Sequence, residues 1–326
     1  MASVSKVLRI GENHARRLHG FVFSPSAAHR PRSLCRPSTS TASPPQPVAS
    51  PPATTHFGNE TVATPEKAAR VRSVFSSVAE SYDVMNDLLS GGLHRLWKDE
   101  LVRRSGVASA NLLTALDVPA GGAPPLDVLD VAGGTGDVAF RHFDAAGLAG
   151  NIHGGPTNRP VCATVTVCDI NAQMLQVGEA RAAGREATAD ALRFVEGDAE
   201  RLPFGDEDFD VYTIAFGLRN VTDVDAALRD AHRVLRTGGH YLCLEFSRVP
   251  NDVLRNAYDA YSFNVIPKMG AAVAGDEASY RYLVESIRKF SDQSQLITKM
   301  ENAGFVGCSY TNLAGGIVAI HEGWKM

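Results

Sequence analysis

Apolar and polar positions along this chain alternate between two patterns. Short apolar runs, typical of buried strands, lie at residues 126–131, 163–168, 192–196, 209–216 and 240–246. Between them, apolar residues recur at helical spacing, most clearly over 172–183 and 224–235, where the second helix is expected to end at Gly238 and Gly239. Strands that alternate with helices indicate βαβ units and a parallel sheet with right-handed crossovers. The pattern therefore predicts an α/β domain.

Two helices are predicted ahead of this alternating region. Ordered structure is expected to begin near Pro65, with Thr64 as a helix cap and Pro65 in the first turn. Apolar residues at helical spacing continue from there to Tyr82, and after a polar break a second helix is predicted over 93–102. Polar groups gather at the break, where helix ends leave backbone groups free to meet a ligand.

The alternation also breaks down toward the carboxyl end. Helical stretches over 252–274 and 280–290 are expected to form a lid over the carboxyl edge of the sheet. A last helix, capped by Ser291, precedes strands over 305–310 and 317–321 that are expected to pair as a hairpin. A segment rich in Gly, Asn and Pro, 147–160, is predicted to be a surface insertion.

The first 50 residues have a different composition from the rest. They hold 7 of the 32 basic residues and 1 of the 36 acidic ones, among many serines, which is typical of an organelle transit peptide. A Ser/Thr/Pro/Ala-rich linker over 38–52 follows, and a generic disordered tail is the alternative. We therefore predict a leader and linker over about 1–50 and one folded domain over 64–326.

Charge and composition narrow the class of partner. Without the leader, 25 basic and 35 acidic residues remain and no basic stripe is visible, which argues against nucleic acid. No apolar run approaches the roughly 18 residues of a membrane span, so any membrane contact is expected to be peripheral. The cysteines outside the leader show no C-x-x-C pairing and no metal-ligand spacing, so no metal is expected.

A glycine-rich turn follows the first predicted strand of the alternating region. Residues 129–137, Leu-Asp-Val-Ala-Gly-Gly-Thr-Gly-Asp, form an apolar run that ends in glycines and opens a helix, as in nucleotide-binding loops. The spacing Gly134-x-Gly136-x-x-Ala139 also fits the dinucleotide fingerprint, which is weak support when it stands alone. Gly133, Gly134, Thr135 and Gly136 are the predicted ligand contacts, and a purely structural glycine turn remains the alternative.

Polar residues end the following strands as well. In an open parallel sheet, ligands bind outside the carboxyl ends of the strands, where Asp169, Asp198 with Ala199, and residues 217–220 converge. Asp169 is placed to accept hydrogen bonds from ribose hydroxyls, and Asp198 with the Ala199 N–H to bind an adenine, although each acid alone could be a helix cap. These carboxylates would repel a pyrophosphate. A cationic sulfonium nucleoside, S-adenosylmethionine, therefore fits the site better than a dinucleotide.

Two long motifs resemble one known family. Residues 82–97, with Tyr82, Asp83, Met85, Asn86, Ser90, His94 and Trp97 at matching spacing, and residues 233–247 are similar to the two signatures of the ubiquinone/menaquinone-biosynthesis C-methyltransferases. The resemblance covers roughly residues 64–326. It departs from the family at Arg236-Thr237, and Ala132 replaces the first glycine of the general methyltransferase loop.

This resemblance implies a fold and a reaction. The fold would be that of a class I S-adenosylmethionine-dependent methyltransferase, Rossmann-like, with a mostly parallel seven-stranded sheet, an antiparallel terminal strand, added N-terminal helices and a helical lid over about 251–290. The segment 147–160 and the carboxyl end resemble the mitochondrial branch, which methylates a carbon of 2-methoxy-6-polyprenyl-1,4-benzoquinol in ubiquinone synthesis. That branch implies peripheral attachment to the matrix side of the inner membrane and partners in a ubiquinone-synthesis complex; a homodimer is left open.

The resemblance also assigns roles. Arg219, with Asn220, would handle the charge of the acceptor, by electrostatic stabilisation of a phenolate because a guanidinium does not deprotonate. Tyr82, an acid or an ordered water would be the base, and Asn86 would contact the cofactor. The alternatives are an Arg219 paired with Asp223 or Asp225, and a Tyr82 packed in the core.

The sequence leaves the roles of other residues, and several competing functions, undecided. His94 and Trp97 could be a helix-packing pair. Apolar lid residues are expected to line a tunnel for the polyprenyl tail and to touch the membrane: Val253, Ala257, Tyr261, Phe263, Val265, Ile266 and Met269. A plastid phylloquinone or menaquinone methyltransferase, an NAD-dependent oxidoreductase and a non-catalytic scaffold of a quinone-synthesis complex are the competing functions.

Overall fold

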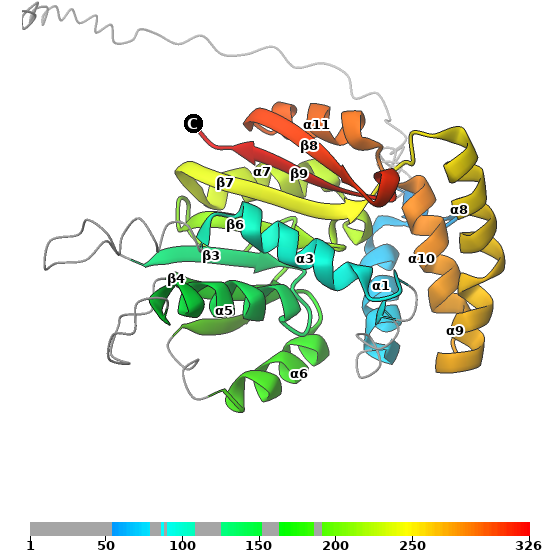
Figure 1. Ribbon diagram of the computed structural model, residues 1–326, viewed down its shortest axis with the longest axis horizontal. Coiled ribbons are helices and arrows are strands. Elements are labelled where there is room, and N and C mark those ends of the chain that lie inside the picture. Colours follow the sequence, from blue (N-terminus) through cyan, green and yellow to red (C-terminus); the bar gives the residue numbers. More distant parts are fainter. Residues whose placement is uncertain (1–53, 79–85, 88–89, 108–124, 152–162, 186–190) are drawn as a thin grey trace, which may run out of the picture. The chain divides into compact units, whose positions relative to one another are not determined.

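The protein is described by a computed structural model over residues 54–78, 86–87, 90–107, 125–151, 163–185 and 191–326 (Figure 1). The predicted leader and most of the segment 147–160 lie outside these residues, as does Tyr82. Residues 51–326 form one compact unit.

A seven-stranded sheet is the centre of the domain (Figure 1). Its strands, in chain order, are β3 (Leu126–Val131), β4 (Ala163–Asp169), β5 (Leu192–Glu196), β6 (Phe209–Ala215), β7 (Leu235–Phe246), β8 (Val306–Leu313) and β9 (Val318–Trp324). In space they follow the order β5-β4-β3-β6-β7-β9-β8. Strand β9 runs antiparallel to both its neighbours, whereas β3 to β7 pair in parallel. The predicted mostly parallel sheet with an antiparallel terminal strand is confirmed.

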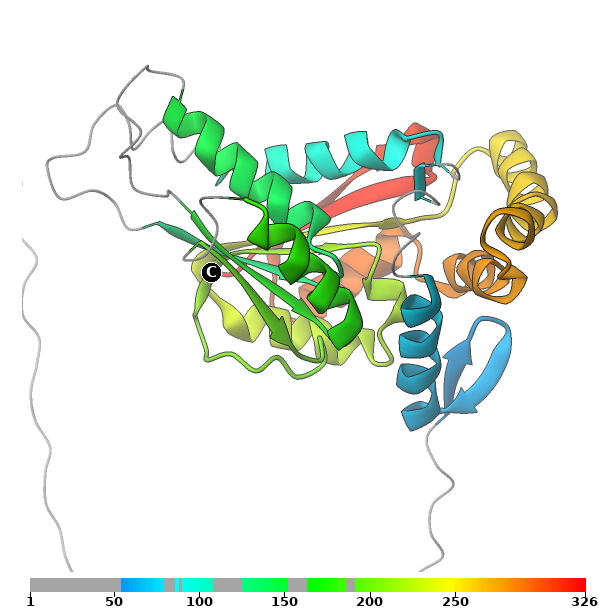
Figure 2. The same ribbon diagram turned by 90° about the horizontal axis from the view of Figure 1, so that it is seen from below.

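Helices cover both faces of this sheet (Figure 2). The helices α3 (Leu93–Arg104) and α5 (Asp137–Asn151) cover one face, and α7 (Val224–Val234) and α11 (Gln293–Asn302) cover the other. Helix α6 (Ala172–Ala183) packs on β4 and β5. Two apolar cores result, one around Leu101 of α3 and one around Leu228 of α7, because buried parallel strands present apolar side chains to both sides.

Three helices form the predicted lid. They are α8 (Asp252–Asn264), α9 (Ile266–Ala274) and α10 (Glu277–Lys289), which lie side by side in both views (Figures 1 and 2). The stretch 252–274, predicted as one helical segment, is two helices that meet at Val265, where Pro267 occupies the first turn of α9. A proline fits there because the first turn has no intrahelical partner for its missing N–H. Gly270 lets α9 approach α10, since a Cβ at that position would overlap the ring of Tyr280.

A hairpin that the sequence did not predict precedes the first helix. Strands β1 (Thr54–Phe57) and β2 (Glu60–Ala63) pair antiparallel through a turn at Gly58, whose φ is +57°. Helix α1 (Thr64–Val78) follows directly. The hairpin is held against α10, because Phe57 stacks on Tyr282 with ring centroids 4.1 Å apart and Asn59 N–H donates to Glu285 at 2.9 Å. The described structure thus includes regular elements about ten residues before the predicted start at Pro65.

Two predicted boundaries also differ. Strand β7 begins at Leu235 directly after α7, so Gly238 and Gly239 lie within the strand instead of ending the helix. The last helix is capped by Asp292, not Ser291: its carboxylate accepts from Gln295 N–H, and the Gln295 side chain accepts from Asp292 N–H. This reciprocal arrangement is a capping box, which satisfies two helix-end donors. No helix among the described residues is long and apolar enough to cross a membrane.

Candidate active site

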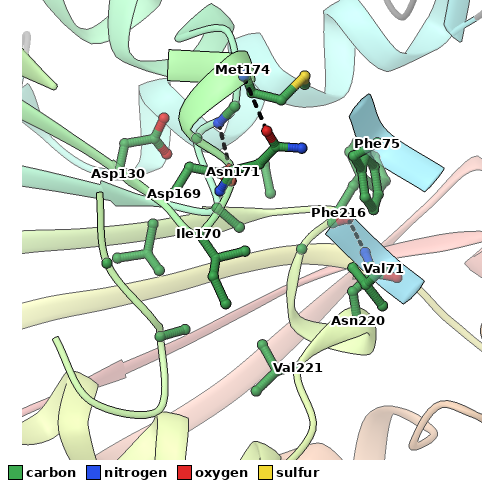
Figure 3. A pocket seen from close by; sticks show the side chains of 18 of the residues that line it. Val71, Phe75, Asp130, Asp169, Ile170, Asn171, Met174, Phe216, Asn220 and Val221 are labelled. Atoms are coloured by element: carbon green, nitrogen blue, oxygen red, sulfur yellow. Dashed lines mark hydrogen bonds between the residues drawn. The ribbon is translucent and has the colours of Figure 1, made fainter. Parts of the chain in front are cut away.

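A first cavity lies at the carboxyl ends of β3, β4 and β6, between these strands and α1 (Figure 3). Most of the residues predicted to bind a cofactor line it: Gly133, Gly134, Thr135, Asp169, Asp198 and Ala199, together with Asn220. The structure thus brings together residues that lie up to 87 positions apart, as the convergence of parallel strand ends requires. Gly136 is not one of the lining residues but stabilises the turn of the loop: its N–H donates to the Gly133 carbonyl at 2.9 Å, and its φ is +84°.

The glycine loop is tightly fitted to its surroundings. A Cβ on Gly133 would lie 2.7 Å from Asp130 Oδ2 and 2.8 Å from a methyl of Val167, so only glycine fits without a shift. Gly134 has a φ of +55°, and its N–H donates to Asp169 Oδ2 at 2.9 Å. The loop backbone is therefore open to a ligand and fixed in place by the end of the neighbouring strand.

Asp169 is held by backbone donors at the end of β4. Its second oxygen, Oδ1, accepts from Asn171 N–H at 2.8 Å. Asn171 in turn caps α6, since its side-chain oxygen accepts from Gln173 N–H at 3.0 Å and from Met174 N–H at 3.4 Å, the latter bond being drawn in Figure 3. Burial raises the pKa of the Asp169 carboxyl, and the N–H groups of Asn171 and Gly134 act against that rise. A fixed carboxylate with free lone pairs at this strand end is suited to accept hydrogen bonds from a ribose.

Asp130 is a cavity residue that the sequence analysis missed. It lies on β3 with 1% of its surface exposed, and its Oδ1 accepts from the Thr213 hydroxyl at 2.8 Å. Its Oδ2 is buried and has no hydrogen-bond partner among the described residues. Burial raises the pKa of Asp130 to about 7. The signal was present in the sequence, since an acid inside the apolar run 126–131 needs a partner once it is buried.

These features test the fit of a cationic cofactor. Asp130 lines this cavity and has a buried, unpaired carboxylate oxygen, so a ligand ammonium or sulfonium in the cavity would compensate its charge. The glycine cradle beside it leaves the backbone accessible. The residues present therefore fit S-adenosylmethionine.

A second cavity, of about 540 Å³, adjoins the first. It lies among α1, α3, the lid helices and the end of β7, and apolar and aromatic side chains form most of its wall, among them Val74, Trp97, Phe246, Tyr258, Ile266 and Tyr282. Three residues, Phe75, Lys98 and Phe216, line both cavities. Lys98 is anchored there, because its buried ammonium lies 2.8 Å from Asp137 at the start of α5. The polar wall residues Asn86, His94 and Arg219 belong to this second cavity.

Arg219 is held in a buried ion pair on the wall of the second cavity. Its guanidinium lies 3.0 Å from Glu245 Oε1, with side-chain exposures of 4% and 0%, and it also donates to the Phe216 carbonyl. Glu245 accepts from the backbone N–H of Arg219 at 3.2 Å and of Phe246 at 2.8 Å. The partner is therefore Glu245, and not Asp223 or Asp225 as the structural alternative supposed.

The two acids considered for that alternative have other partners. Asp223 caps α7 by accepting from Ala226 N–H at 2.9 Å, and Asp225 lies 2.7 Å from Lys299. Although both acids are close to Arg219 in sequence, the partner of Asp223 lies within α7 and that of Asp225 lies on α11.

Asn220 and Asn86 lie in different cavities. Asn220 lines the first, where its Oδ1 accepts from the Tyr282 hydroxyl at 3.0 Å, and burial raises the pKa of Tyr282 to about 12. Asn86, predicted to contact the cofactor, lines the second cavity. Tyr82 lies outside the described residues, so its role stays a prediction. No cluster of three or more potential metal ligands occurs within the described part of the chain.

Comparison with known proteins decides the class of this site. A sequence profile of the ubiE/COQ5 methyltransferase family matches residues 63–325. This chain belongs to that family. As a member of the ubiE/COQ5 methyltransferase family it is an S-adenosylmethionine-dependent methyltransferase, and the predicted family, fold class, enzyme class and cofactor are confirmed.

Similar proteins cover almost the whole chain. The mitochondrial 2-methoxy-6-polyprenyl-1,4-benzoquinol methylase of Danio rerio is 44% identical over 345 residues, which cover 98% of each chain. The protein of the same name from Homo sapiens is 46% identical over 297 residues, covering 84% of this chain and 85% of that one. The ubiquinone/menaquinone biosynthesis C-methyltransferase UbiE of Roseobacter denitrificans is 48% identical over 273 residues, covering 84% of this chain and 97% of its own.

Proposed function

We propose that this chain methylates a ring carbon of 2-methoxy-6-polyprenyl-1,4-benzoquinol in ubiquinone synthesis. The observation that carries the proposal is the second cavity, which is mostly apolar, has a volume of about 540 Å³ and shares three wall residues with the first. A hydrophobic aromatic acceptor with a long apolar tail suits such a wall. The Danio rerio relative, matched over 98% of its length, carries the name of this activity.

The first cavity would hold the cofactor. Asp169 would accept from the ribose hydroxyls, Asp198 and the Ala199 N–H would bind the adenine, and the loop Gly133–Gly136 with Thr135 would receive the methionine part. Asp130 would compensate its positive charge. When bound, S-adenosylmethionine supplies an electrophilic methyl group.

The second cavity would hold and activate the acceptor. Methylation of an aromatic carbon needs an electron-rich ring, which the quinol becomes once a hydroxyl loses its proton. Arg219 would stabilise the phenolate electrostatically from the wall of a mostly apolar site, where charges interact more strongly than in water. Asn220, fixed by Tyr282, would position groups at the boundary of the two cavities.

The decisive experiment is a methylation assay with two acceptors. Purified protein is mixed with S-adenosylmethionine and either a prenylated methoxybenzoquinol or a prenylated naphthoquinol, and the products are identified by mass spectrometry. Turnover of the benzoquinol supports the proposal. Turnover of the naphthoquinol alone supports the plastid alternative, and calorimetric cofactor binding without turnover of either acceptor supports the scaffold alternative.

Membrane contact through the lid is part of the proposal. Several large apolar side chains of the lid are exposed to solvent, including Val253 at 80% and Phe263 at 48%. Ile266, by contrast, is 5% exposed and lines the second cavity, so it belongs to the proposed acceptor site and not to a membrane surface. The lid would thus rest peripherally on a bilayer that delivers the tail to the cavity.

Liposome flotation tests the membrane surface. Val253→Glu and Phe263→Glu should each weaken flotation, whereas Leu96→Glu, at a 63%-exposed apolar residue on α3, should not. Equal flotation of all three variants would contradict a lid-specific contact. Import of a fluorescent fusion of residues 1–60 would test the mitochondrial leader, and co-purification with other ubiquinone-synthesis proteins would test the proposed complex.

A further inference from the structure

We propose that His94 is the general base that accepts the hydroxyl proton of the phenolic acceptor. The inference rests on the proposed function, because it assigns a role to a residue of the proposed acceptor cavity. His94 lies in the first turn of α3 and is 5% exposed, and its imidazole lies on the wall of the second cavity.

The hydrogen bonds of His94 fix its tautomer. Nδ1 lies 2.9 Å from Ser90 Oγ, and the Ser90 hydroxyl donates its single proton to the Asn86 carbonyl at 2.6 Å. The hydroxyl oxygen is therefore an acceptor toward the imidazole, so the proton sits on Nδ1. Asp87 Oδ1, 3.7 Å from Nδ1, favours the same tautomer. Nε2 then carries the lone pair.

Nε2 is left available for a ligand. No described residue hydrogen-bonds to it, whereas Nδ1 is held by Ser90. A base oriented through one ring nitrogen and open at the other is the arrangement that proton abstraction requires. A merely structural histidine would instead satisfy both nitrogens or pack them against apolar groups.

The charges around His94 keep it neutral. Burial and then Lys98 lower its pKa from the ordinary value of 6.5, Arg95 acts in the same direction, and Asp87 and Asp137 act against it. Arg219 also lies on this cavity wall, where its charge is paired with that of Glu245. The imidazole is therefore unprotonated at neutral pH and ready to accept a proton.

Other described groups on this cavity wall are poor bases. Arg219 remains protonated in proteins and is paired with Glu245. Burial raises the pKa of Tyr258 and of Tyr282, and the Tyr282 hydroxyl already donates to Asn220. The carboxylates near the reaction centre, Asp130, Asp137 and Asp169, line the first cavity.

Proton transfer to His94 precedes the transfer of the methyl group. The acceptor O–H bond breaks and an N–H bond forms at His94 Nε2, while the electron pair spreads from the oxygen to the adjacent ring carbon. That carbon forms the new C–C bond as the sulfur–methyl bond of the donor breaks, leaving a neutral thioether. The proton on the methylated ring carbon is then lost, the ring regains its aromaticity, and the phenol oxygen is reprotonated from His94. One proton is released to solvent per methyl transferred.

The test compares His94→Asn with the wild-type protein on the benzoquinol. Asparagine keeps a donor near the position of Nδ1 but has no counterpart of Nε2. We expect kcat to fall by about 10²- to 10⁴-fold with unchanged calorimetric affinity for S-adenosylmethionine. The wild-type kcat should fall as the pH drops below 6.5, because His94 becomes protonated, and this acidic limb should be missing in the variant.

Chemical rescue separates a base from a structural residue. Added imidazole should restore turnover to His94→Ala in a concentration-dependent way. Both His94 variants are first checked by thermal melting and cofactor binding; if His94→Asn does not fold, the rescue and the wild-type pH profile decide. A folded His94→Asn with wild-type kcat, or a folded His94→Ala that imidazole does not rescue, would overturn the assignment. An inactive wild-type protein would instead refute the proposed function.

Discussion

The buried pair of Arg219 and Glu245 offers the sharpest test of what holds the acceptor cavity together. Arg219→Met leaves the Glu245 carboxylate with two backbone donors, Arg219 N–H and Phe246 N–H, so its charge stays partly compensated. Glu245→Gln leaves the guanidinium with the Phe216 carbonyl and a neutral amide. Breaking a buried pair typically costs about 3–5 kcal/mol. We expect Arg219→Met near the lower end of this range and Glu245→Gln near the upper end.

The double variant separates a charge effect from lost packing. Arg219→Met with Glu245→Gln contains no buried charge, and the glutamine oxygen still accepts from the two backbone N–H groups. Its free energy of unfolding should therefore lie above that of either single variant. The four proteins are compared by urea denaturation at one pH without cofactor. Single-variant losses that add to within about 0.5 kcal/mol in the double variant would show that the two side chains are uncoupled and refute the reasoning.

Three further predictions follow from the cofactor cavity. Gly217→Ala should lower the free energy of unfolding by about 1–3 kcal/mol, because the added Cβ would overlap that of Ala132. Gly184→Ala is the control and should change it little, since the nearest atom to its added Cβ is 3.7 Å away. Equal urea midpoints for the two variants would contradict this prediction. Without cofactor, Asp130 should contribute a loss of unfolding free energy as the pH rises from about 4 to about 7, since folded Asp130, with a pKa near 7, keeps a proton that the unfolded chain has released. Buried histidines such as His142 and His321, whose pKa values are lowered to about 4, act in the opposite direction. In urea titrations the unfolding free energy of Asp130→Asn should therefore rise more steeply with pH than that of the wild-type protein, and equal slopes would refute this assignment. Asp169→Ala should weaken S-adenosylmethionine binding about 10- to 100-fold in calorimetry, since it removes charged hydrogen-bond acceptors, and an unchanged affinity would exclude the ribose contact.

Local patterns were enough to predict the sheet and the cofactor loop. The strand over 126–131, the glycine turn after it and Asp169 at the next strand end are each visible in a short window, and parallel topology alone brings them together. The alternation of strands and helices likewise predicted β3 to β7, and β8 and β9 were predicted separately as a terminal hairpin. What failed were boundaries, such as the cap of the last helix, where neighbouring residues Ser291 and Asp292 are both capable of capping.

Contacts between distant segments lay beyond sequence reasoning. Glu245 lies 26 residues from Arg219, so nearer acids were the natural candidates for its partner. The hairpin at 54–63 consists of two four-residue strands with many polar residues, and it depends on the Phe57–Tyr282 stack rather than on local propensity. The tautomer of His94 depends on a serine whose own proton is committed elsewhere, which only the geometry shows.

The backbone at Ala132 and Phe216 explains how the loop accommodates alanine at its first position. Both residues have positive φ, +52° and +56°, so β3 and β6 leave the sheet through the same uncommon backbone conformation. Ala132 stands where related loops have glycine, and the space for its methyl group exists because residue 217, on the adjacent strand end, is glycine. A Cβ on residue 217 would lie 2.4 Å from the Cβ of Ala132, so only one of the two positions has room for a methyl group. We therefore expect alanine at one of positions 132 and 217 to require glycine at the other.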